Sequence, residues 1–411
     1  MRTLLLASAA ALTLLGTVTP AYAADEAETL ADAITNGKAT VSFRLRNENV
    51  DQDGFADTAN ALTMRTKLKY GTKVFKGFSA VLEVDNVIAL DNNYNSTING
   101  RTNRPVVADP KMTEINQAYL AYTGIDKATL LVGRVGLNMT NQRFVGTVGW
   151  RQNDQTYDTA AAIIKPTKDL TLTGAYVWNV NRIFSDKHPF GNLDTDSIWA
   201  SAEYTGFGLG KLSAYGLFID LNDVPVFGLS SQTLGVRFDG KHKLGDSEMT
   251  MLYEAEFATQ SDYKDSPLDY SAQYYHVSAG LSAGGLTGKV GYEVLGSDNG
   301  VASFQTPLAT LHKFNGWADK FLGTPAGGLE DFYGSVFYKV SGESAFKGLT
   351  FGAVYHDFSA DVGGDYGSEI DLLVKKKFGK NYYGSLKFAD YNASGFASDT
   401  QKIWVTLGAN F

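Results

Sequence analysis

The sequence contains no cysteine, few prolines and only one long hydrophobic run. Without cysteine among 411 residues, neither a disulfide nor a thiolate metal site can stabilise the fold. The 9 prolines are outnumbered by 43 glycines, and no Pro- or Ser-rich linker divides the chain into two domains. The one long apolar run is Leu4–Val18, so the rest of the chain offers no candidate for a membrane-spanning helix. If the mature protein spans a membrane, it must do so with strands.

Residues 1–23 have the organisation of a secretory signal peptide. A basic start at Arg2 precedes the apolar run, and Ala21-Tyr22-Ala23 supplies small residues for cleavage after Ala23. The whole chain has a net charge of −8, and the loss of Arg2 makes the mature chain one unit more negative. This acidic balance argues against nucleic acid as a partner.

Polar and apolar residues alternate along many segments after residue 39. In the first of them, Val41, Phe43 and Leu45 alternate with Ser42 and Arg44. Successive strand side chains point to opposite faces, so each segment predicts a strand with one apolar and one polar face. The final segment keeps this phase to its last residue, as a membrane barrel requires, because the last strand must pair with the first and leave no edge in lipid. For that segment alone, an ordinary edge strand of a soluble sheet is the alternative.

Eighteen such segments are predicted: 39–48, 62–70, 78–85, 114–122, 128–137, 156–165, 169–180, 197–205, 211–220, 232–240, 247–258, 269–282, 286–296, 331–340, 348–358, 368–377, 381–391 and 400–411. Their connections alternate long and short, as in 49–61 followed by 71–77 and 138–155 followed by 166–168. Short periplasmic turns and long external loops are typical of outer-membrane barrels. We therefore predict an all-β fold, a transmembrane antiparallel β-barrel of about 18 strands. Residues 24–38 would form a periplasmic leader with a helical turn or two, and residues 39–411 a single barrel.

Four segments resemble the alginate-export-like family of bacterial outer-membrane porins. They are ALTMRTKL at 61–68, PVVADP at 105–110, NQRFVGTVGWRQNDQTY at 141–157 and TPLATLHKFNGWADKF at 306–321. The resemblance spans most of the mature chain, and 141–157 is its most specific part. It implies an eighteen-stranded monomeric channel in the outer membrane and, in the best-known members, a basic pore that passes an anionic polysaccharide.

The polar strand faces are expected to line a wet lumen, because a barrel of this size is too wide for side chains to fill. Lys or Arg facing lipid would cost about 2–4 kcal/mol at the bilayer midplane. The expected pore-lining residues are the basic Arg44, Arg46, Arg65, Lys67 and Lys69 and the acidic Glu83, Asp85, Glu254, Glu256 and Asp371. These charges either sort solutes through a focused field or pair across strands and brace the wall, at about 0.2–1 kcal/mol per pair. Both interpretations stay open.

The long loop that contains residues 141–157 is predicted to form the constriction. Guanidinium groups bind carboxylates in a bidentate manner, and aromatic rings offer sugars a flat apolar face. The candidate residues are Arg143, Trp150, Arg151, Gln152, Asn153, Asp154, Gln155 and Tyr157. If the loop folds inward, Arg143 and Arg151 would join the basic wall and favour anions. A surface loop held by its own hydrogen bonds is the alternative.

A second loop, near residues 297–330, carries apolar residues at helical spacing and predicts a packed helical lid or plug rather than a binding site. These residues are Leu308, Leu311, Phe314, Trp317 and Phe321.

Two weaker patterns suggest other chemistry. Asp51, Asp53, Gly54 and Asp57 form a fragment of a calcium loop, but the later bidentate Glu of the full motif is absent. His276 and Ser278 have the spacing of the His-x-Ser pair of barrel lipid hydrolases, whose Ser needs an adjacent base. The pair falls on the lumen side of its strand, away from lipid substrates. We therefore expect no enzyme activity, no cofactor and no metal.

The sequence thus predicts a porin-like outer-membrane channel for passive diffusion of polar solutes, with anionic sugars or oligosaccharides as candidates. The main alternative is a polysaccharide export channel of the alginate type. A barrel lipid hydrolase and a non-conducting surface protein are alternatives that the sequence favours less. The expected partners are outer-membrane lipid, the solute and the barrel-assembly machinery, which would recognise the C-terminal strand through Phe411. A monomer is expected.

Overall fold

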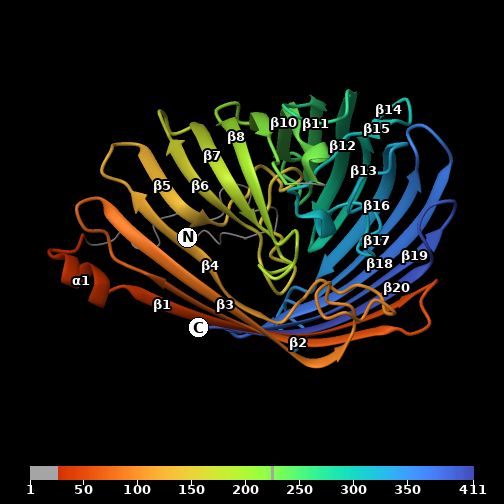
Figure 1. The fold of residues 1–411 in the computed structure, drawn as a ribbon, viewed down its shortest axis with the longest axis horizontal. Coiled ribbons are helices and arrows are strands. Elements are labelled where there is room, and N and C mark those ends of the chain that lie inside the picture. Colours follow the sequence, from red (N-terminus) through yellow and green to blue (C-terminus); the bar gives the residue numbers. More distant parts are fainter. Residues whose placement is uncertain (1–25, 224–225) are drawn as a thin grey trace.

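Eighteen antiparallel strands form one closed sheet, and this barrel makes up most of the protein (Figure 1). The structure is a computed structural model that describes residues 26–223 and 226–411, so the predicted signal peptide lies outside the described residues. The barrel strands are β1 (Lys38–Gln52), β2 (Ala59–Gly71), β3 (Phe78–Asn93), β4 (Met112–Tyr122), β5 (Ala128–Val135), β6 (Thr156–Ile164), β7 (Leu170–Asn181), β8 (Asn192–Tyr204), β9 (Gly210–Ile219), β10 (Ser231–Lys243), β11 (Thr250–Asp262), β12 (Ser271–Ala283), β13 (Leu286–Leu295), β16 (Leu329–Lys339), β17 (Thr350–Ser359), β18 (Asp365–Phe378), β19 (Tyr382–Ala393) and β20 (Thr400–Asn410). Each strand pairs with the next in the chain, and all eighteen predicted segments fall on these strands.

The barrel closes where β20 pairs with β1. Leu45 lies opposite Leu407, and at the end of the seam Phe411 N donates to Val41 O at 2.8 Å while Val41 N donates to Phe411 O at 3.1 Å. The apolar phase that runs to the last residue therefore serves closure, as predicted. No backbone edge of the sheet is left to face lipid.

Little else in the described residues is regular. The α-helix α1 (Leu30–Thr35) precedes β1 and lies beside its start (Figure 1), and Asp32 N donates to the capping Oγ1 of Thr29 at 3.0 Å. Two 3-10 turns, η1 (Val226–Leu229) and η2 (Leu311–Lys313), and a small sheet of β14 (Ser297–Asp298) and β15 (Ala302–Ser303) lie between barrel strands. No helix in the described part of the chain is long and apolar enough to cross a membrane.

The barrel wall has an apolar outer face, and its inner face is largely polar except on β5 to β9, where apolar side chains such as Trp199 and Leu217 are buried. The outward side chains of Leu68, Phe332 and Val405 are 53%, 54% and 45% exposed, whereas the inward Thr63 and Asp331 are 0% and 1% exposed. The period of two in the sequence therefore predicted correctly which residues face lipid. It also predicted the inward direction of Arg44, Arg46 and Glu256, which are buried.

Three of the outer loops are long, and they decide the shape of the interior. We name them L2 (94–111), L3 (136–155) and L7 (296–328). The predicted strict alternation of long and short connections is wrong at two places. Because β1 and β2 extend further than expected, their loop is only 53–58, no longer than the turn 72–77. The turn 340–349 is longer than the outer loop 360–364, and the length of a connection alone therefore does not identify its side of the membrane.

L7 packs inside the barrel, but the predicted helix is wrong. Leu308 and Phe321 are buried, as expected for a packed plug, yet η2 is the only helical turn described in this loop. Positive φ angles at Asn315 (53°), Gly316 (84°) and Asp319 (60°) interrupt any helix. The backbone groups of L7 bond instead to other elements, as described below.

Candidate channel constriction

The arginines of β1 hold L3 against the barrel wall. Arg44 Nη1 donates to Gly149 O at 2.9 Å, and Arg44 Nε donates to Gln152 Oε1 at 2.9 Å. Arg46 Nη1 donates to Trp150 O at 2.7 Å, and its guanidinium lies 4.1 Å from the centre of the Trp150 ring. The first two members of the predicted basic wall therefore bind loop carbonyls and a ring. They are buried and brace the loop.

Arg151 of L3 lies in a cluster of carboxylates. Its Nη1 contacts Glu48 at 2.9 Å and Asp109 at 3.9 Å, and its Nη2 contacts Asp319 of L7 at 3.2 Å. Burial lowers the pKa of Arg151, but Glu48, Asp109 and Asp319 outweigh it and raise the pKa above its ordinary value. Arg151 is thus a permanent cation that ties β1, L2, L3 and L7 together.

Arg143, the other arginine of L3, is 1% exposed and is neutralised in the same way. Its Nε donates to Glu293 Oε1 of β13 at 2.8 Å, and its Nη2 donates to Asn315 Oδ1 of L7 at 2.9 Å. Burial again lowers the pKa of Arg143, and Glu293 reverses the shift and raises it. Both predicted anion-attracting arginines therefore lie inside ion pairs rather than on an open surface.

Asp154 joins L3 to the basic residues of β2. Lys67 Nζ lies 2.5 Å from Asp154, 3.1 Å from Glu83 and 3.3 Å from Asp85, and Arg65 Nη1 lies 3.6 Å from Asp154. Burial raises the pKa of Asp154, but Lys67 and Arg65 outweigh it and lower the pKa, so Asp154 is ionised. The predicted basic and acidic wall residues thus lie side by side in one network.

Lys69 and the acids of β11 line other parts of the wall. Lys69 contacts Glu83 at 3.6 Å, and its side chain is 36% exposed. Glu256 accepts from Arg237 Nη1 at 2.7 Å, and Glu254 contacts Lys289 at 3.3 Å.

L3 and L7 also pair with each other across the lumen. Val145 and Leu308 form a parallel bridge, and Gly146 N donates to Leu308 O at 2.9 Å. Gln155 Nε2 donates to Leu308 O at 3.1 Å, and Tyr157 OH donates to Gly146 O at 2.8 Å. Gln155 and Tyr157, predicted as constriction residues, therefore join the two loops.

Asp319 is the central residue of the contact between L7 and the wall. It accepts from His312 Nδ1 at 2.7 Å, and it contacts Lys402 of β20 and Arg151 at 3.2 Å each. Burial lowers the pKa of His312 to about 3, so this imidazole is neutral. A neutral ring with its proton on Nδ1 can accept at Nε2 from Lys387 Nζ, which lies 2.8 Å away.

Aromatic rings surround Lys387 of β19. Its Nζ lies 3.6 Å from the centre of the Trp317 ring and 4.1 Å from that of Trp150. The Trp150 and His312 rings stack at 4.0 Å with an angle of 7° between their planes. Lys387 therefore binds both loops through cation–π contacts and a hydrogen bond.

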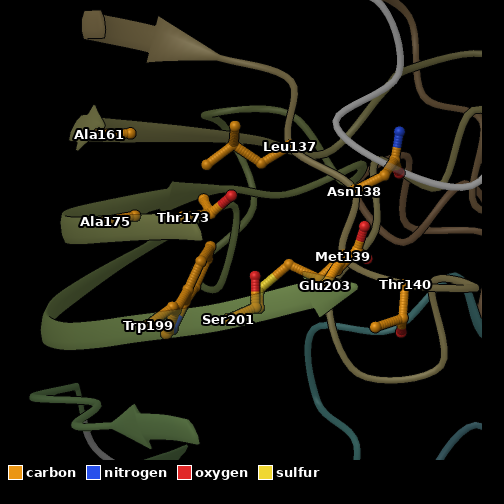
Figure 2. A pocket seen from close by; sticks show the side chains of 10 residues that line it. All are labelled: Leu137, Asn138, Met139, Thr140, Ala161, Thr173, Ala175, Trp199, Ser201 and Glu203. Carbon is orange, nitrogen blue, oxygen red and sulfur yellow. The ribbon is translucent and has the colours of Figure 1, made fainter. Parts of the chain in front are cut away.

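The other side of L3 packs on an apolar part of the wall. Leu137 to Thr140 face Ala161, Ala175 and Trp199 of β6, β7 and β8, around a cavity of only 20 Å³ (Figure 2). Phe144 lies 5.2 Å from Tyr215, ring centre to ring centre, and is 4% exposed. Hydrophobic burial holds this half of the loop.

The sequence named Arg44 with its partner Gln152, and Asp154 with its partners Lys67 and Arg65, as candidates. It did not name the other residues that the structure brings into these ion-pair networks, which are Glu48, Asp109, Arg237, Glu293, Asp319, Lys387 and Lys402. Those that lie on strands could have been predicted from sequence, because they fall on the polar, inward face of an alternating strand. Asp109 and Asp319 carry no such signal, because their loops have no repeating geometry.

Residues of both weaker patterns have other partners in the structure. His276 Nε2 bonds to Tyr333 OH at 2.9 Å, and no hydrogen bond joins His276 to Ser278 in the described chain. Asp57 contacts Arg104 at 3.3 Å, and the described residues contain no group of three or more His, Cys, Asp or Glu side chains arranged for a metal.

In fold, the barrel is similar to several solved structures. Acinetobacter baumannii OccAB2 is 17% identical, with a TM-score of 0.71 over 91% of this chain and 98% of that chain. Pseudomonas aeruginosa OpdO is 14% identical, with a TM-score of 0.73 over 93% and 98% of the two chains. Pseudomonas aeruginosa OpdK, solved with vanillate, is 14% identical, with a TM-score of 0.72 over 91% and 98%. No curated protein matches the sequence.

Residues 38–289 match the protein family described as alginate export. This match covers more than half of the chain and begins at the first residue of β1. Together with the apolar outer face of a closed barrel, it locates the protein in the outer membrane. The chain belongs to the alginate export family.

Proposed function

We propose that the protein is a porin-like channel through which small polar solutes, anionic ones among them, diffuse passively across the outer membrane. The observation that carries this proposal is the pair of inward loops, L3 and L7, which narrow a closed barrel whose inner wall is charged. A closed barrel of this size offers a water-accessible path, and inward loops set its width and charge. The solved structures with the same fold support a channel, and OpdK was solved with a small carboxylate, vanillate.

The alternative is a polysaccharide export channel, which the family name favours. A polymer chain needs a continuous wide lumen, whereas L3 and L7 pair directly at Val145 and Leu308. Export would require these loops to separate and the contacts of Asp319 to break. The observed loop pairing therefore favours small solutes.

The charge in the constriction is balanced rather than purely basic. Arg143 and Arg151 are paired with carboxylates, so they hold the loops in place and add little uncompensated charge to the constriction. Lys313 is exposed and donates to the carbonyl oxygen of Asn141 rather than to a carboxylate, so its charge can attract anions. Lys69 is 36% exposed but contacts Glu83. We propose a weak preference for anionic solutes.

We also propose that the protein is a non-enzymatic monomer. The hydrogen bond of His276 to Tyr333, rather than to Ser278, supports the absence of a Ser–His pair. The C-terminal strand that ends at Phe411, where β20 meets β1, is our candidate signal for the barrel-assembly machinery.

Planar-bilayer recording tests the channel. Purified protein should give discrete conductance steps, and liposomes that contain it should swell in small sugars and monocarboxylates but not in long uronate oligomers. Absence of both conductance and swelling would instead support a non-conducting surface protein. Block of the current by long uronate chains, together with their passage into liposomes, would support export.

A further inference from the structure

On the outer side of the barrel, the hairpin of β5 and β6 is shorter than the neighbouring strand β4, which leaves a notch in the rim. β5 ends at Val135 and β6 begins at Thr156, and pairing of β4 with β5 starts only at Ala118. Residues Met112–Gln117 of β4 are therefore paired with β3 but not with β5. β4 therefore extends past the end of β5, whereas the last residue of β7, Asn181, lies level with the first residue of β6, Thr156.

The fourth outer loop, L4 (182–191), extends over this notch and contacts β4. Asp186 N donates to Glu114 Oε1 at 3.1 Å, and Asn153 Nδ2 of L3 lies 3.4 Å from Glu114 Oε2 and 3.5 Å from Arg182 O. A cavity of 290 Å³ remains below L4, well above the roughly 10–15 Å³ that one water needs. Its charged lining residues are Glu114, Arg134, Arg182 and Asp186.

The two arginines of this cavity differ in their partners. Arg134 Nε and Nη2 donate to the two oxygens of Asp158 at 2.8 and 3.2 Å, a bidentate pair. Arg182 forms no ion pair with any described carboxylate, and its buried Nε has no hydrogen-bond partner. Its guanidinium lies 4.7 Å from the centre of the Phe184 ring. The buried Arg143 and Arg151 have carboxylate partners. Arg44 and Arg46 have none among the described residues, but their guanidinium groups donate to loop carbonyl oxygens.

Burial without a carboxylate lowers the pKa of Arg182 to about 10. Arg182 is partly buried, and a partly buried cation that lacks both a counter-charge and a full set of hydrogen bonds is costly. Its guanidinium donates to no acceptor among the described residues, and Arg182 lines the cavity, so a ligand there can accept from it.

We propose that this cavity binds one singly charged oxyanion, a carboxylate or a phosphodiester group, through Arg182. A group with one negative charge fits better than a doubly charged phosphate, because Glu114 and Asp186 also line the cavity and repel additional charge. Ile115, another lining residue, is 51% exposed on the outer face, so the cavity lies at the barrel wall, and both a lipid phosphodiester and a soluble carboxylate are candidates. Oxyanion binding at this cavity is independent of whether the barrel conducts ions.

The test compares Arg182→Gln with Lys187→Gln, which removes the same charge from an exposed position of L4. Benzoate binding to purified protein in neutral detergent is measured by titration calorimetry, and phosphatidylglycerol retained from mixed micelles by native mass spectrometry. We expect one saturable site in the wild type and in Lys187→Gln, weakened about tenfold or more in Arg182→Gln. Arg182→Lys should retain an intermediate affinity, because a lysine keeps the charge but not the planar donor fork.

The two probes distinguish the sources of the oxyanion. Benzoate binding without lipid retention assigns the site to soluble carboxylates, and lipid retention that benzoate displaces assigns it to a headgroup. Equal binding by wild type and Arg182→Gln, or no binding of either probe to the folded wild type, would overturn the proposal. Folding of each variant is checked by heat-modifiable migration on gels.

Discussion

L3 is held by two walls of the barrel in two different ways. Toward β1, β2, β19 and β20 it is fixed by charge, through Arg44, Lys67 and the Asp319 cluster. Toward β6, β7 and β8 it is fixed by apolar packing around Leu137 and Trp199. Ion pairs depend on salt, pH and geometry, whereas apolar burial depends mainly on area. The charged wall should therefore control opening, and the apolar wall should anchor the loop.

The largest effect is expected from Asp319→Ala, which leaves Arg151, His312 and Lys402 without their shared carboxylate. Removing one partner of a buried ion pair costs about 3–5 kcal/mol, enough to release L7 from the wall. Single-channel conductance should rise several-fold in planar bilayers. Asp246→Ala, in the exposed turn 244–249, is the matched control and should leave conductance unchanged. Unchanged conductance in Asp319→Ala would mean that other contacts hold L7.

Leu137→Ala tests the apolar wall. The change should lower the free energy of unfolding by about 2–5 kcal/mol, because Leu137 is 3% exposed and its removal enlarges a cavity. Denaturant titration in detergent measures this loss. Unlike the effect of Asp319→Ala, it should be the same at low and high salt. A strong salt dependence would contradict the distinction between the two walls.

Acid should weaken the charged wall through His312. Its pKa is about 3 when L7 is docked, against an ordinary value of 6.5, so the released loop binds a proton more readily. Docking is therefore favoured above pH 6.5 and is lost as the pH falls toward 3, by at most about 1.4 kcal/mol per pH unit. The pKa of Asp319, also lowered when docked, adds a loss in the same direction below pH 4.

Open probability should consequently increase between pH 6.5 and pH 3, recorded as conductance at fixed salt. His312→Gln keeps a polar side chain that cannot titrate and should flatten the response between pH 6.5 and pH 4, above the range in which Asp319 titrates. If the variant kept the full pH response, the sensor would be another group.

Arg143→Ala combined with Arg151→Ala should shift selectivity toward cations. The two arginines neutralise Glu293 and Glu48, so their loss exposes fixed negative charge in the constriction. The reversal potential under a salt gradient measures the shift, and heat-modifiable migration on gels checks folding. An unchanged reversal potential would mean that ions pass elsewhere in the lumen.

The smallest effect is expected from Asp57→Asn. Asp57 contacts Arg104 at 3.3 Å with 47% of its side chain exposed, and exposed pairs contribute about 0–1 kcal/mol. Thermal stability should change little, with or without added calcium. Loss of a calcium-dependent stabilisation in this variant would revive the calcium-loop interpretation.

The sequence by itself determined the barrel and the direction of its side chains. A period of two is a local property of extended backbone, so Arg44, Glu256 and Leu68 could be placed on the correct face from sequence alone. The apolar phase that continues to Phe411 likewise predicted closure with the first strand.

The tertiary structure decided what those side chains do. Whether Arg151 attracts a solute or binds Glu48 and Asp319 depends on how L2, L3 and L7 fold inward. L7 lacks the predicted helix because its backbone binds partners far away in the sequence, such as Gly146 of L3 and Glu369, which accepts from Ala318 N. The cavity at Arg182 arises from the unequal heights of neighbouring strands. Such contacts join residues 51–168 positions apart, and no local pattern encodes them.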